Sequence, residues 1–458
     1  MTGLSASAVA GFGVAIGTSF ITYGVSQGEA GAIWTAAGLG CAAITLFATR
    51  AIPEIVTAFG IFLTALALGV VPREIVFSGF MSGGFWLLVS GIILGAAITT
   101  TGLASRISES LLAVTGPSYP RAILIVAAAG MALGVLIPST MPRIIIMIPV
   151  AAALAEHLRL EPDGRGAIGL IATAATATLL PTYTILTANL PTIVQVGAMD
   201  QLYGVHSTYS GYLLQQWPVN LLRFVLLVGL MVGFSREPVG AKETAKTDSK
   251  PARPEQRRLL VVLGAAILMW MTDFAHGIPP AWVALTAAAV VIWPRFGMLS
   301  RTAMREQIDL TPAIFFTSIV TVVSVAREVS LDQVLADFII STLPLDGGGG
   351  LSSIYGVYGF SLLLSHLTTA PAAPAVLVPF AAPLAEATGL SLEVISMTQI
   401  IGIATPAIPF QAPPLIVAMS ISKVPNAVFL RLCLWLALAV TLVGIPLTYV
   451  WWQIIGFV

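Results

Sequence analysis

Long, uninterrupted apolar segments recur along almost the whole chain, and most are long enough to cross a lipid bilayer. They lie at 8–24, 30–48, 53–71, 80–101, 213–234, 259–274, 280–297, 311–328 and 428–456. Only 9% of the residues are charged, whereas soluble domains have about 25%. Backbone groups cannot reach water inside a bilayer, and these runs are continuous rather than alternating, so they predict helices and not a barrel. We therefore expect an all-α integral membrane protein embedded in the lipid bilayer.

Four further apolar blocks are interrupted by prolines, which remove a backbone donor and break a helix. They are 121–155, 166–197, 353–387 and 391–420. Each arm of 121–155 is only about 17 residues long, the lower limit for a span, and the prolines lie at its tip. We predict that 121–155 and 353–387 are two re-entrant hairpins, and that about 11 transmembrane helices cross the membrane.

The second part of the chain repeats features of the first. The segment IPVAAALAE at 148–156 reappears as VPFAAPLAE at 378–386, and Asn189-Leu190-Pro191 aligns with Gln411-Ala412-Pro413. An odd number of helices separates the two copies, which predicts inverted repeats, as in many secondary transporters. The expected division is an extra N-terminal helix at 1–29, a first inverted repeat at 30–234, a polar cytoplasmic linker at 235–258 and a second inverted repeat at 259–458.

The distribution of lysine and arginine predicts the orientation. With the hairpins treated as re-entrant, most of the 21 basic residues fall on one side, while Arg73 and Arg327 fall on the other. The positive-inside rule then places the N-terminus in the cytoplasm. We expect an integral protein of the bacterial inner (plasma) membrane. The formal net charge of zero gives no reason to expect a nucleic-acid partner.

Each of the four proline-interrupted blocks contains one helix break. A substrate site is expected where these four breaks meet, because discontinuous helices expose backbone polar groups near the middle of the membrane. Arg143 could bind an anion with its guanidinium, snorkel, or pair with an acid such as Glu156. Asn189 and Gln411 could line the site or satisfy freed backbone, and His366 could pack or carry a proton. The candidate substrate-binding residues are Ser139, Thr140, Arg143, Asn189, Thr368, Thr369, Gln411 and Pro413.

Several stretches give the chain a resemblance to a known family. They are TTGLASRISESLL at 100–112, STMPRIIIMIP at 139–149, TAPAAPAVLVP at 369–379 and QAPPLIVAM at 411–419. Together with the layout of residues 30–458, they resemble the divalent anion/sodium symporters, which are the dicarboxylate, citrate and sulfate carriers of the ion transporter superfamily. The resemblance implies a homodimer in which the hairpin-bearing domains move like elevators past a scaffold, formed by 30–71, 213–234 and their second-half counterparts.

The two hairpin tips depart from this family's pattern. Family members carry Ser-Asn-Thr at both tips, where it binds substrate carboxylates and helps to form two sodium sites. Here the triplets read Ser139-Thr140-Met141 and Thr369-Ala370-Pro371. Hard cations need oxygen ligands, so we expect weak or no dependence on sodium, with at most a residual site near Ser139, Thr140 and Thr369. No other cofactor or metal is expected.

These features predict a secondary active transporter of a small organic or inorganic anion: a di- or tricarboxylate, sulfate or sulfonate. One alternative is a cation/proton antiporter of the same superfamily, which would need an acidic residue at a break, and the four breaks contain none. A membrane-embedded enzyme would need clustered metal ligands, whereas the four histidines are scattered. An anion channel stays open as an alternative.

Overall fold

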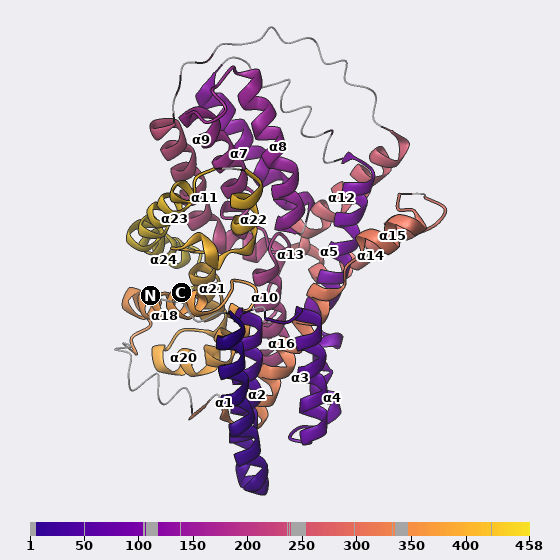
Figure 1. Ribbon diagram of the computed structural model, residues 1–458, viewed down its shortest axis with the longest axis vertical. Helices are drawn as coiled ribbons and strands as arrows, with labels where there is room; N and C mark the ends of the chain where they lie inside the picture. Colours follow the sequence, from indigo (N-terminus) through magenta and orange to yellow (C-terminus); the bar gives the residue numbers. More distant parts are fainter. Residues whose placement is uncertain are drawn as a thin grey trace.

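The regular secondary structure that the computed structural model describes is helical (Figure 1). No strand occurs in the part of the chain that the structure describes, which confirms the all-α fold. The expected segment at 100–112 and the linker lie largely outside that part. The described residues are 6–49, 51–103, 106, 118–137, 139–235, 237, 239, 253–296, 298–331, 333–334, 347–422 and 424–458.

The helices follow the expected segments closely. Before the linker they are α1 (Ala6–Ser26), α2 (Ala32–Thr49), α3 (Glu54–Leu68), α4 (Arg73–Val76), α5 (Gly83–Thr100), α7 (Tyr119–Leu136), α8 (Thr140–His157), α9 (Arg165–Ala177), α10 (Leu190–Tyr203) and α11 (Tyr209–Phe234). After it they are α12 (Pro254–Met271), α13 (Asp273–His276), α14 (Pro280–Ile292), α15 (Arg301–Gln307), α16 (Thr311–Glu328), α18 (Leu351–Leu367), α19 (Ala373–Leu377), α20 (Ala381–Thr388), α21 (Leu392–Ile403), α22 (Pro413–Ser422), α23 (Asn426–Ala439) and α24 (Ile445–Ile454).

Each expected proline-broken block contains a helix break. The first becomes the antiparallel pair α7 and α8, and the third becomes α18 followed by α19 and α20. Between α9 and α10 the chain forms a short 3-10 helix at Pro181–Thr184, and between α21 and α22 another at Pro409–Gln411. Proline stands in the first turns of α10 and α22, where its missing N–H removes no intrahelical bond.

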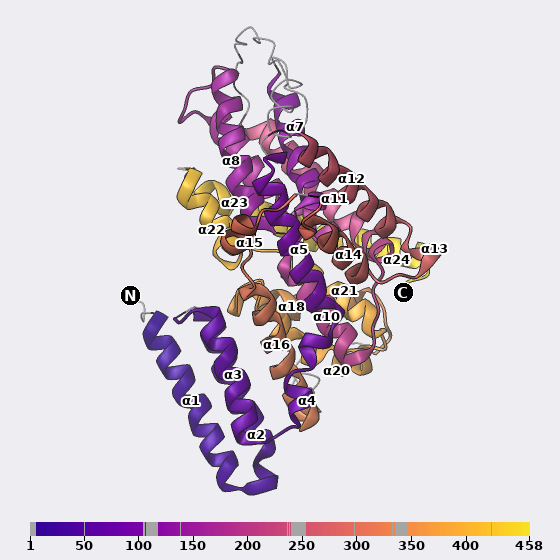
Figure 2. The ribbon, with the colours of Figure 1, turned by 90° about the vertical axis from the view of Figure 1, so that its right-hand side faces the viewer.

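The two parts of the chain pack into each other. Helix α5 lies along α14, and α16 lies along α2 and α3 (Figure 2). Helices α9 and α16 are the most deeply buried of the long apolar helices, whereas α1 pairs with α2 at one edge of the molecule. Small residues allow the close crossing of that pair, since a Cβ atom on Gly38 would stand 2.5 Å from the carbonyl oxygen of Gly17.

Nine helices in the described part of the chain are long and apolar enough to cross a membrane. They include both arms of the first hairpin, α7 and α8, at 18 residues each. Two expected spans are shorter, since α3 has 15 residues and α14 has 13. The number of crossings, the inverted relation of the two repeats and the domain boundaries therefore stay predictions.

Candidate functional site

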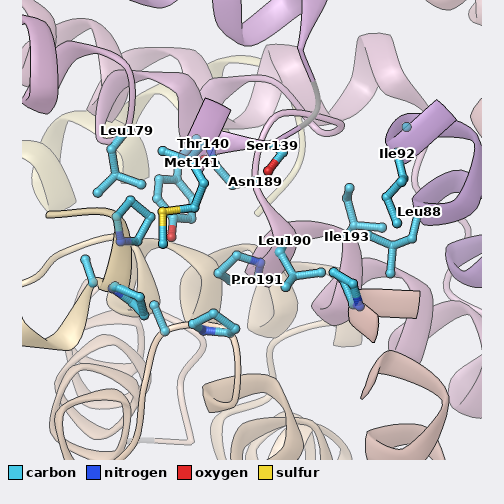
Figure 3. Close-up of a pocket in the computed structure, with 18 of the residues that line it drawn as sticks. Leu88, Ile92, Ser139, Thr140, Met141, Leu179, Asn189, Leu190, Pro191 and Ile193 are labelled. Carbon is cyan, nitrogen blue, oxygen red and sulfur yellow. The ribbon is translucent and has the colours of Figure 1, made fainter. Parts of the chain in front are cut away.

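One cavity of about 210 Å³ lies where the four breaks meet (Figure 3). Both hairpin tips line it, as do both broken-helix segments. The residues that the breaks contribute are Ser139, Thr140, Met141, Asn189, Leu190, Pro191, Ala370, Pro371, Ala412, Pro413 and Pro414. The rest of the wall comes from α3, α5, α16 and the residues around the break between α9 and α10. These residues are Glu54, Leu88, Gly91, Ile92, Leu179, Tyr183, Ile193 and Pro312.

Three helices begin at the cavity wall. Thr140, Leu190 and Pro413 are the first residues of α8, α10 and α22, and all three line the cavity. The residues before α8 and α10, Ser139 and Asn189, are of types that usually cap a helix, yet neither side chain caps the first turn. First-turn N–H groups carry partial positive charge and bind anions. Helices α8 and α10 keep such groups, whereas α22 begins with Pro413 and Pro414, which have none. This arrangement therefore suits a negatively charged ligand.

Arg143 lies behind the cavity wall. It connects the first hairpin tip, between α7 and α8, to the helix break between α9 and α10. Its Nη2 donates to Thr140 Oγ1 at 2.7 Å, to the Ala188 carbonyl oxygen at 2.7 Å and to Asn189 Oδ1 at 3.2 Å. Its Nε donates to the Ser139 carbonyl oxygen at 3.2 Å. Arg143 itself does not line the cavity, so it fixes two residues that do, Thr140 and Asn189, rather than facing the cavity directly.

The guanidinium of Arg143 is fully buried, and it forms no ion pair with a described residue. Its Nη1 has no hydrogen-bond partner and lies against Gly134, where a Cβ atom would stand 2.6 Å away. A buried charge without a counter-ion is costly and marks function in membrane proteins. The positive charge of Arg143, which lies directly behind lining residues, also favours an anion in the cavity.

The second hairpin tip, between α18 and α19, is held to the helix break between α21 and α22 by different groups. The Ala370 N–H donates to the Gln411 carbonyl oxygen at 3.1 Å. The ring of His366 bridges its own helix and the break, since the Ala407 N–H donates to Nε2 at 2.9 Å while Nδ1 lies 2.7 Å from the Leu362 carbonyl oxygen. These bonds make Nδ1 the donor and Nε2 the acceptor of a neutral ring, which gives His366 a structural role here.

The predicted site residues divide into two groups of four. Ser139, Thr140, Asn189 and Pro413 line the cavity. The other four, Arg143, Thr368, Thr369 and Gln411, lie next to lining residues without being part of the wall. Gln411 directs its amide Nε2 to the Ile403 carbonyl oxygen at 3.3 Å, which satisfies freed backbone at the break.

Sequence analysis missed two features near the site. Glu54, the first residue of α3, brings a carboxylate to the cavity wall. Arg223 on α11 is almost fully buried and reaches the second half, where its Nη2 donates to Thr405 Oγ1 at 2.7 Å, and its Nη1 donates to Asn220 Oδ1 at 2.6 Å. Arg223 could have been found from the sequence, because it is a lone arginine within the apolar run 213–234. No sequence feature marks Glu54 as a site residue.

The fold and this cavity define an α-helical membrane transporter. No group of three or more potential metal ligands exists among the described residues. The chain belongs to the sodium:sulfate symporter family, because the model of the sodium:sulfate symporter transmembrane region matches residues 12–458. This is a family of transporters and not of enzymes, and the resemblance inferred from the sequence is confirmed.

Known relatives are distant but cover most of the chain. A membrane protein of Cupriavidus necator is 24% identical over 398 residues, covering 83% of this chain and 77% of that protein. The Escherichia coli inner membrane protein YbhI is 23% identical, covering 78% of each. An uncharacterized transporter of Haemophilus influenzae is 20% identical, covering 89% of each.

A solved structure shares the fold. The Alcanivorax borkumensis YdaH transporter matches with a TM-score of 0.60 at 17% identity, over 84% of this chain and 87% of that one. At this identity, the likeness concerns the fold alone.

Proposed function

We propose that the chain is a secondary active transporter that moves a small anion by alternating access. The observation that carries the proposal is the meeting of both hairpin tips and both helix breaks at one cavity, beside the buried guanidinium of Arg143. Discontinuous helices whose N-termini point at anionic groups recur in transporters of this architecture. Two such N-termini, those of α8 and α10, and one unneutralised cation favour an anion over a cation.

The size of the cavity favours a small substrate. Its volume of about 210 Å³ lies below the roughly 300–1,000 Å³ of pockets that hold drug-sized ligands. The polar side chains of Ser139, Thr140 and Asn189 stand among mostly apolar walls. Di- and tricarboxylates, sulfate and sulfonates are the substrate classes that we propose.

An elevator movement and a homodimer belong to the same proposal. The cavity lies between the hairpin-bearing elements on one side and α3, α5 and α16 on the other. A substrate bound there would move with the hairpins past these helices. The relative YbhI is an inner membrane protein, which supports our placement of this chain in the bacterial inner membrane, and a cytoplasmic N-terminus remains part of the proposal.

Uptake by proteoliposomes tests the proposal. Purified protein should carry labelled sulfate, succinate or citrate into vesicles, with uptake that saturates and that unlabelled substrate inhibits. Asn189→Leu removes a polar group from the wall and should reduce uptake at least about 10-fold, the loss of one hydrogen bond to a charged group. Thr286→Val, on the exposed side of α14, is the control and should leave uptake unchanged. Rates that never saturate would indicate a channel instead.

A cation/proton antiporter is the second candidate, and Glu54 is the observation that favours it. Antiport needs a carboxylate that takes up and releases protons at the site, and Glu54 lines the cavity. Glu54→Gln keeps the shape and removes the charge. If the chain is an antiporter, this variant should abolish cation-driven proton movement across vesicles. If it is an anion transporter, anion uptake should survive the change within a few-fold.

A further inference from the structure

A second cavity, of about 500 Å³, opens between α9, α11 and α23, away from the site described above. Helix α11 packs against both α9 and α23 (Figure 1). Most of its wall is apolar, and the polar exceptions are two arginines and one serine. The lining residues are Arg165, Ile168, Leu230, Met231, Phe234, Ser235, Val428, Arg431, Leu432 and Trp435. We call this cavity the α9–α23 groove.

The two arginines of the groove come from different helices. Arg165 is the first residue of α9, and Arg431 stands in the second turn of α23. Both are exposed, and neither forms an ion pair with a described residue. No acidic side chain is among the described residues that line the groove. Two guanidinium groups that form no ion pair with a described residue therefore share one hollow.

One carboxylate lies close by. The oxygens of Glu237 pack against Gly164 and Gly166, beside the first turn of α9. That acid therefore offsets part of the positive charge at the N-terminus of α9. It is not part of the groove wall.

The apolar part of the groove faces outward. Phe234 is 68% exposed and Trp435 is 53% exposed, and both belong to helices long and apolar enough to span the membrane. Exposed rings on such helices are suited to contact with lipid. Trp435 follows Arg431 by one helical turn, so an aromatic ring and a cation lie on the same face of α23.

We propose that the α9–α23 groove binds an anionic phospholipid. Its phosphate lies between Arg165 and Arg431, and one acyl chain runs along Leu230, Phe234 and Trp435. Guanidinium groups bind phosphate through two parallel hydrogen bonds, and basic pockets between transmembrane helices bind anionic head groups. A hollow with cations at one end and lipid-facing apolar walls fits a two-part ligand better than a free anion or a flat protein partner.

Lipid titration of the purified protein tests this. Binding of dioleoyl phosphatidylglycerol and of dioleoyl phosphatidylcholine is measured by native mass spectrometry, and by the shift in unfolding temperature in detergent. Wild-type protein should prefer phosphatidylglycerol. Each of Arg165→Gln and Arg431→Gln should weaken its binding about 5-fold, and both together about 25-fold, as expected for basic residues near an anionic surface.

Two further variants separate charge from shape and from general effects. Val428→Trp narrows the groove, keeps both arginines and should also reduce phosphatidylglycerol binding; it decides the question if the double variant does not fold. Arg301→Gln removes an exposed arginine that, like Arg165, is the first residue of a helix, and it should change nothing.

Three results would overturn the proposal. Equal binding of the two lipids by the wild type would show that the arginines do not select an anionic head group. Equal stabilisation by glycerol 3-phosphate or inorganic phosphate, at the concentration of the lipid, would mean a free-anion site. Dissociation of an oligomer in the groove variants, with lipid binding unchanged, would mean that a second copy of the chain covers the groove.

Discussion

The Nη2 atom of Arg143 lies 2.7 Å from the carbonyl oxygen of Ala188, although 45 positions separate the two residues in the sequence. This bond joins the first hairpin tip to the break between α9 and α10. The same nitrogen also donates to Thr140 and Asn189. One side chain therefore sets the relative positions of two parts of the cavity wall.

Arg143→Ala should abolish anion uptake, whereas Arg143→Lys should keep a weakened remnant. Alanine leaves the Ala188 carbonyl and the Thr140 and Asn189 side chains without their buried donor, at about 1–3 kcal/mol each. Lysine keeps the charge but loses the planar fork that reaches three acceptors. Initial uptake rates in proteoliposomes should fall at least about 100-fold for alanine.

The control for this prediction is Arg121→Ala, because Arg121 is an exposed arginine in the first turn of α7. It should transport as the wild type does. Elution as a single peak and an unfolding temperature near that of the wild type establish that each variant is folded. Wild-type rates in folded Arg143→Ala would show that the guanidinium has no part in transport.

Gly134→Ala should reduce uptake through the same guanidinium. A Cβ atom at this position would stand 2.6 Å from Arg143 Nη1 and 2.6 Å from Thr182 Cγ2. Both neighbours are buried, so the guanidinium must move away from its acceptors. The matched control is Gly95→Ala on α5, where nothing lies within 4 Å. There the change removes a helix-interior glycine and should stabilise the protein by up to about 1 kcal/mol.

Uptake and thermal unfolding, measured on the two glycine variants together, separate the effects. Gly95→Ala should leave uptake unchanged and raise the unfolding temperature slightly. Gly134→Ala should lower uptake about 10-fold or more, comparable to losing one hydrogen bond to a charged group. Similar behaviour of both variants would contradict a tightly held Arg143.

The sequence predicted the helices well because a bilayer leaves a strong signal in the chain. Expected spans 30–48 and 213–234 became α2 and α11 with ends shifted by four residues or fewer. The breaks were also predictable, because proline lacks the N–H that a helix interior needs. Thus the four-way meeting at the cavity could be inferred from Pro191, Pro413 and the hairpin tips.

The direction in which each side chain points could not be predicted in the same way. Arg143 stands one turn into α8, and whether its guanidinium enters the cavity or lies behind Thr140 depends on the packing of residues 188 and 189. Similarly, aligning the tips selected Thr369, whereas the neighbouring Ala370 and Pro371 form the wall.

Arg223 and Thr405 should show strong energetic coupling across the two halves of the chain. The Arg223 Nη2 donates to Thr405 Oγ1 at 2.7 Å, 182 positions along the sequence. A double-mutant cycle of Arg223→Met and Thr405→Val should give a coupling energy of about 1.5–3 kcal/mol, the range for a hydrogen bond to a charged group. The coupling energy is measured by thermal unfolding of the wild type, the two single variants and the double variant in a defined detergent and lipid. Strictly additive effects would mean that the bond does not fasten α11 to the second break.

Transport should depend on sodium weakly or not at all, despite the family's name. Thr140 holds the position where sodium-dependent members carry asparagine, and its hydroxyl already accepts from Arg143 Nη2 at 2.7 Å and donates to Asn189 Oδ1 at 2.8 Å. A sodium ion on that oxygen would lie within about 5 Å of the guanidinium. Two like charges at that separation repel by on the order of 3 kcal/mol at an effective dielectric constant of about 20.

The remaining tip positions offer little to replace that ligand. Met141, Ala370 and Pro371 have no side-chain oxygen, and a hard cation needs about six oxygen ligands. The permanent charge of Arg143 instead supplies the positive potential that sodium would lend to an anion site, so the driving force should be protons or exchange against another anion. Uptake into vesicles under sodium, proton and counter-anion gradients, imposed one at a time, distinguishes these sources. A steep, strict requirement for sodium would show that backbone carbonyls at the breaks complete a cation site in spite of the guanidinium.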